Sequence, residues 1–110
     1  MEPRPAAAHG FHVDLVEDRD RVQVRVVGEL DLVTAPVLDR HLAGALGRRA
    51  LVVVDLSAVT FLDVRGINTL VSANAAATES GTRLVVRGAG PHVRRMMSLC
   101  GLEGHLALEG

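Results

Sequence analysis

Two uninterrupted aliphatic runs, at residues 51–54 and 84–86, constrain the fold of this chain more than any other feature. Runs of Val and Leu without polar alternation are typical of strands that are buried on both faces, as in parallel sheets. Parallel neighbours need a long crossover connection, and the segment between the two runs has the apolar spacing of a helix that begins after Asp63. The sequence therefore predicts an α/β fold.

The N-terminal half adds a hairpin and a helix to this unit. Apolar and polar residues alternate at 11–15 and at 22–26, which predicts two paired antiparallel strands. Thr34 is the expected N-cap of a helix that Gly47 ends.

The C-terminal part is expected to form one more helix and a strand. Pro91 begins the helix and Gly101 ends it in a left-handed conformation. The tail at residues 105–110 is expected to add a short edge strand. The resulting order of the main elements is ββαβαβα. We predict a flexible arm over residues 1–10 and a single domain over residues 11–110.

The helix after Asp63 is expected to have two contrasting faces. Its inward side is predicted to carry Val64, Ile67, Leu70, Val71, Ala75 and Thr78, and its outward side Arg65, Thr69, Ser72 and Ala76. The core is predicted to include Val53, Ile67, Leu70, Val85 and Met96.

Composition narrows the classes of function. The formal net charge of -1 gives no electrostatic reason to expect nucleic acid or an acidic membrane as a partner. No apolar run approaches the ~20 residues of a membrane-spanning helix, so no direct membrane insertion is expected. The lone Cys100 has no partner for an internal disulfide, and residues 1–10 lack a secretory apolar stretch. We therefore expect a cytoplasmic protein.

Residues for catalysis or for a bound metal are missing from the sequence. The five histidines show no metal-ligand spacing, and Cys100 falls on an apolar helical stripe, where a cysteine usually packs as a small hydrophobe. Asp31 and Asp63 have no nucleophile placed beside them by any motif. We predict no catalytic residues, no metal site and no cofactor.

Two polar clusters have no role in the predicted core, at residues 28–31 and at residues 61–66. Both fall at loop ends, where binding sites are usually found. The outward face of the helix after Asp63 continues from the second cluster. From the residues alone, a solvated surface and a protein interface are equally good interpretations of this face.

Three segments together resemble the STAS domains of bacterial anti-sigma factor antagonists. They are residues 28–31, residues 53–57 through 61–63, and residues 91–95 through 99–102, and the resemblance covers the chain from residue 11 to about 106. It implies a mixed sheet of four or five strands with helices packed mainly on one face. It also implies partner switching, in which the antagonist binds an anti-sigma factor of the serine-kinase type until the kinase phosphorylates it.

The sequence departs from the family at the phosphorylated position. The family's serine directly follows an aspartate, usually within Asp-Ser-Ser/Thr-Gly, whereas here Val64 follows Asp63 and no phosphoacceptor is left. The resemblance implies that the partner-binding residues are Asp31, Thr34, Asp63, Val64, Arg65, Gly66, Asn68, Thr69 and Ser72. Two alternatives stay open: a constitutive STAS scaffold or transporter-complex subunit, and a small module that binds phosphate or a nucleotide.

Overall fold

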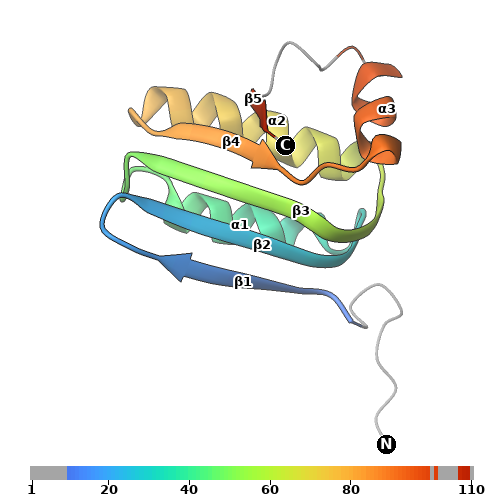
Figure 1. The fold of residues 1–110 in the computed structure, drawn as a ribbon, viewed down its shortest axis with the longest axis horizontal. Coiled ribbons are helices and arrows are strands. Elements are labelled where there is room, and N and C mark those ends of the chain that lie inside the picture. Colours follow the sequence, from blue (N-terminus) through green and yellow to red (C-terminus); the bar gives the residue numbers. More distant parts are fainter. Residues whose placement is uncertain (1–9, 100, 102–106, 110) are drawn as a thin grey trace, which may run out of the picture.

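The computed structural model describes residues 10–99, 101 and 107–109. Five strands form one mixed sheet in the order β1-β2-β3-β4-β5, and three helices connect them (Figure 1). The strands are β1 (His12–Glu17), β2 (Arg21–Leu30), β3 (Leu51–Leu62), β4 (Arg83–Arg87) and β5 (Ala107–Glu109), and the helices are α1 (Ala35–Ala45), α2 (Val64–Glu79) and α3 (Pro91–Leu99).

The sheet confirms the predicted class and topology. β1 and β2 form the antiparallel hairpin, whereas β2, β3, β4 and β5 are parallel neighbours joined by helical crossovers. β5 is the short edge strand expected near the C-terminus. Residues 1–9, where most of the predicted arm falls, lie outside the described residues, as do Cys100 and residues 102–106.

The core lies between the sheet and the helices α1 and α2, which lie side by side over one face (Figure 1). Alternate valines of β2 and β3 form one hydrophobic core with the buried leucines of α1 and with the face of α2 that contains Ile67. Four of the five predicted core residues are buried: Val53, Ile67, Leu70 and Val85. Met96 is only partly buried, because the stripe of α3 that faces the core is centred on Val93 and Met97.

The predicted inward face of α2 is wrong in its second half. Ile67 and Leu70 are buried, but the stripe continues through Ala73 and Ala77, while Ala75 and Thr78 are exposed. The first residue of the helix, Val64, is also exposed. Four alanines fall within five positions here, so their apolar character does not mark which of them face the sheet.

The face of the sheet that α1 and α2 leave uncovered has a row of alternating charges. One residue from each strand stands in cross-strand register, and their signs alternate across the sheet: Asp14, Arg25, Asp55, Arg87 and Glu109. Arg25 and Asp14 form an ion pair in which Nη1 and Oδ2 are 4.0 Å apart. Opposite charges in directly opposed positions stabilise neighbouring strands.

Candidate functional site

The two polar clusters meet at the carboxyl ends of β2 and β3. Leu30 pairs with Leu62 in the sheet, and the Asp63 backbone N–H donates to the Leu30 carbonyl at 3.2 Å. Gly66 allows this approach, since a Cβ there would lie 2.8 Å from Cγ of Leu30. The carboxyl ends of strands in open α/β sheets are where ligands usually bind. Residues separated by about thirty positions thus form one surface.

The turn between β2 and α1 is held by a reciprocal hydrogen-bond network of Asp31 and Thr34. Oδ1 of Asp31 accepts from the backbone N–H groups of Val33 (2.9 Å) and Thr34 (3.1 Å). The Thr34 hydroxyl accepts from the Asp31 N–H at 2.9 Å and donates to the Glu29 carbonyl at 2.7 Å.

The prediction for Thr34 is therefore right in position and wrong in the capping hydrogen bond. Thr34 occupies the N-cap position of α1, but its side chain makes no capping hydrogen bond. Its hydroxyl is occupied in the turn, and the residue is only 1% exposed. Thr34 shapes the loop that carries the surface residues.

Asp63 caps α2 as predicted. Its Oδ1 accepts from the backbone N–H groups of Arg65 at 2.9 Å and Gly66 at 3.2 Å. A phosphate at this helix start would need the same donors and would meet a carboxylate already bound to them. The local geometry therefore disfavours a phosphate or nucleotide at the start of α2.

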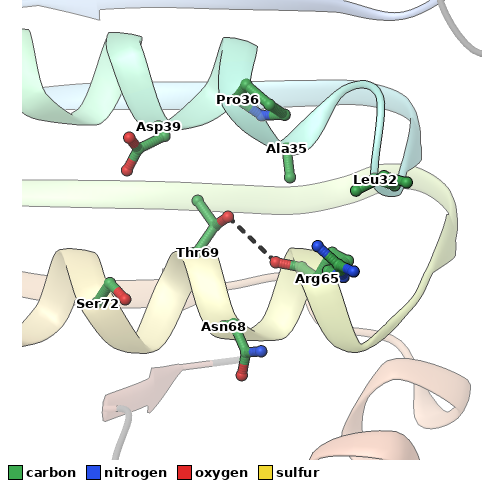
Figure 2. A pocket seen from close by; sticks show the side chains of 8 residues that line it. All are labelled: Leu32, Ala35, Pro36, Asp39, Arg65, Asn68, Thr69 and Ser72. Atoms are coloured by element: carbon green, nitrogen blue, oxygen red, sulfur yellow. Dashed lines mark hydrogen bonds between the residues drawn. The ribbon is translucent and has the colours of Figure 1, made fainter.

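A cavity of about 380 Å³ opens between α1 and α2 next to this end of the sheet (Figure 2). The Thr69 hydroxyl donates to the Arg65 carbonyl at 3.1 Å, within α2 (Figure 2). Arg65 has no ion-pair partner in the part of the chain that the structure describes. Leu32, Ala35, Pro36 and Asp39 line one side of the cavity, and Arg65, Asn68, Thr69 and Ser72 line the other.

Several exposed apolar side chains lie at the same end of the sheet as Arg65, in the β2–α1 turn, at the end of β3 and at the start of α2. Four of the seven large hydrophobic side chains that are exposed among the described residues lie at this end: Leu32 (58%), Val33 (55%), Val64 (52%) and Phe61 (43%). We call these four residues and Arg65 the loop-end surface. Clustered exposed apolar residues mark interaction sites more often than scattered ones do. Leu32 and Val33 were not predicted as site residues, although two adjacent apolar residues in a loop without periodicity were a signal.

The predicted site residues lie in the β2–α1 turn, at the start of α2 and along its outward face, but not all of them reach solvent. Asp31 and Asp63 are half-buried and are engaged with backbone N–H groups, while Thr34 and Gly66 are buried. The predicted residues that present surface are Val64, Arg65, Asn68 and Ser72, with Thr69 partly exposed.

Within residues 10–99, 101 and 107–109, no group of three His, Cys, Asp or Glu side chains is arranged to hold a metal ion. Over the same residues, none of the helices has the length and apolar character needed to cross a membrane.

Comparison with known families decides what kind of domain presents this surface. A family model described as "Mlab, STAS domain" matches residues 13–109. The chain belongs to the STAS domain family. A curated relative of this STAS domain is the anti-sigma-B factor antagonist of Bacillus subtilis (strain 168). The two are 25% identical over 93 residues, which cover 84% of this chain and 85% of the relative.

Solved structures of anti-sigma factor antagonists have the same fold. One from Mycobacterium paratuberculosis superposes on this STAS domain with a TM-score of 0.81 and 30% identity, over 94% of this chain and 89% of that chain. The Bacillus cell fate determinant SpoIIAA in its phosphorylated form superposes with a TM-score of 0.68 over 91% of each chain. At 19% identity, that second likeness shows the fold alone.

Proposed function

We propose that this STAS domain is an anti-sigma factor antagonist that acts by binding, not by catalysis, and that its partner is an anti-sigma factor of the serine-kinase type. The observation that carries the proposal is the loop-end surface, in which exposed apolar side chains lie at the same end of the sheet as an arginine without an ion pair. Its relatives in sequence and structure include anti-sigma factor antagonists.

The loop-end surface has the composition of a binding hot spot. Large apolar side chains gain free energy when a partner removes them from water, and arginine is enriched at the centres of interfaces. Phe61 and Val64 supply apolar area, and Arg65 would pair with an acidic side chain of the partner. The Asp31–Thr34 network fixes the loop that carries Leu32 and Val33, so little conformational entropy is lost on binding.

Arg65→Glu tests this proposal. The substitution reverses one exposed charge and leaves the core intact, so we expect the melting temperature to change little and the affinity for the anti-sigma factor to fall at least tenfold. Isothermal titration calorimetry would measure affinity, using the purified kinase-type anti-sigma factors of the source organism.

The matched control is Arg83→Glu, at the amino end of β4 and away from the loop-end surface. Its affinity is expected to equal that of wild type. Equal affinities for wild type and Arg65→Glu would contradict a loop-end interface. If none of the anti-sigma factors bound wild type, the proposed function itself would be wrong.

One feature favours a second candidate, a constitutive scaffold or transporter-complex subunit. Val64 has no hydroxyl at the position where the family carries its phosphorylated serine, so a partner bound here would not be released by modification of that residue. Purification of the native complex would separate the candidates, since a scaffold would copurify with structural or membrane-transport subunits and not with a kinase.

A further inference from the structure

A second cavity extends the first one along the two helices. It has a volume of about 390 Å³ and shares Asp39 and Ser72 with the cavity beside Arg65. Because they share these two residues, the two cavities adjoin each other between α1 and α2, starting beside Arg65, and we call them together the groove. The second cavity is lined by Asp39, Leu42, Ala43, Leu46, Ser72, Ala73, Ala76 and Ser80.

The shape and surface of this groove fit an α-helix. Its walls carry small exposed side chains, among them Ala43, Ser72 and Ala76, while Leu42 and Ala73 in the second cavity are buried. Small residues between two helices let a third backbone approach closely and let its ridge of side chains fill the groove. The second cavity is lined mostly by Ala and Leu, and a hydrophobic groove is a common receptor for the apolar face of an amphipathic helix.

The charges of the groove define the helix that would fit it. Arg65 and Asp39 line the same cavity from opposite walls, and neither forms an ion pair with any described residue. A bound helix would complement both charges with an acidic side chain at Arg65 and a basic one at Asp39. Two charges of opposite sign also fix the direction in which the helix lies.

We propose that the groove between α1 and α2 receives an amphipathic helix of the anti-sigma factor, with its acidic residue opposite Arg65 and its basic residue opposite Asp39. This inference rests on the proposed function, because the groove starts beside Arg65 of the loop-end surface. It adds a second area of contact, which reaches Ala43 and Ala76 far along the helices.

Two neighbouring alanines of α2 provide a matched test. Ala75 and Ala76 are both exposed, but only Ala76 lines the groove. We expect Ala76→Arg to lower the affinity for the purified anti-sigma factor at least tenfold, and Ala75→Arg to stay within twofold of wild type. Ala43→Arg, from the opposite wall, provides an independent second variant if Ala76→Arg does not fold. We expect Asp39→Arg to weaken binding as well.

The chemistry of the occupant is tested by photo-crosslinking. Benzoylphenylalanine placed at position 43 or at position 76 is expected to crosslink to one segment of the partner, at positions three, four or seven residues apart. Crosslinks to a loop, or at every second residue of a strand, would overturn the helix. If Ala76→Arg and Ala43→Arg both bound with wild-type affinity, the groove would not be a binding site. A loss of affinity in Arg65→Glu would in that case still support the proposed function. Failure of wild type to bind would refute both proposals.

Discussion

Val64 stands at the first position of α2 with about half of its side chain exposed. A phosphoserine at this position would add a charge of roughly -1.5 to -2 beside the Asp63 carboxylate, and valine removes that possibility. We expect no phosphate on wild type near the start of α2 after incubation with ATP and the anti-sigma factor. We expect phosphate on Val64→Ser, or on Val64→Ser/Arg65→Ser, which restores the family's Asp-Ser-Ser-Gly sequence. Mass spectrometry of the digested protein would locate the phosphate.

Hydroxyls near the site define the outcome that would contradict this prediction. Ser57 and Thr60 are exposed on β3, whereas the Thr69 hydroxyl is bound to the Arg65 carbonyl. Stoichiometric phosphate on one of these residues in wild type, together with loss of the complex, would show that the switch lies elsewhere in the chain. Gel filtration of the mixture would measure that loss.

Replacing glycine by alanine is expected to have opposite effects on stability at two helical positions, Gly66 and Gly44. A Cβ on Gly66 would lie 2.8 Å from Cγ and 3.1 Å from the carbonyl oxygen of Leu30, whereas one on Gly44 meets nothing within 4 Å. Overpacking costs about 1–3 kcal/mol, and a contact as short as the one at Gly66 is expected at the upper part of this range, above the ~1 kcal/mol that alanine gains over glycine in a helix. We therefore expect Gly66→Ala to destabilise the protein and Gly44→Ala to stabilise it by about 0.5–1 kcal/mol. Urea denaturation of both variants would measure the two changes. Stabilisation by Gly66→Ala would disprove the close contact.

The capping role expected from the local sequence was correct for one residue and not for another. The cap at Asp63 followed from its position before a helical pattern. Thr34 has an equally good capping side chain, but its hydroxyl hydrogen-bonds to the Glu29 carbonyl and the Asp31 N–H instead. That preference depends on how the β2–α1 turn closes, which a sequence pattern does not contain.

Among the elements, the row of alternating charges makes a testable contribution to the sheet. Arg25→Glu would place an acid between Asp14 and Asp55 in the register of the sheet. Cross-strand pairs contribute about 0.2–1 kcal/mol each, and partial exposure screens them, so we expect a loss of about 1 kcal/mol in the free energy of unfolding. High salt is expected to reduce the loss.

Arg83→Glu is the control for that experiment, because Arg83 lies on the same face and its registered neighbour on β3 is the uncharged Leu51. Its stability is expected to change by less than about 0.5 kcal/mol. Urea midpoints at low and high salt would compare the two variants. Equal losses for both would show that the register of charges has no part in the stability.

For the whole molecule, the sequence predicted the architecture better than the surface. The aliphatic runs of β3 and β4 indicate buried strands, and the helix between them is the crossover that parallel neighbours need, so together they predict the parallel pairing that the structure has. Leu32, Val33 and Phe61 follow no period, so only the folded chain shows that they are exposed at the same end of the sheet as Arg65. The outward face predicted for α2, with Arg65, Thr69, Ser72 and Ala76, does line the two cavities, but the wall that α1 contributes to them was not predicted.

The row of alternating charges also affects whether molecules of this protein associate through their edge strands. Both ends of the row are acidic, with Asp14 on the edge strand β1 and Glu109 on the edge strand β5. If β1 of one molecule paired with β5 of another at this level, two carboxylates would face each other, and such head-to-tail pairing is the kind that repeats into an open filament. Leu15 and Val16 leave β1 with exposed apolar side chains, which favour that pairing. The odd number of strands, with an acid at each end, opposes fibre growth.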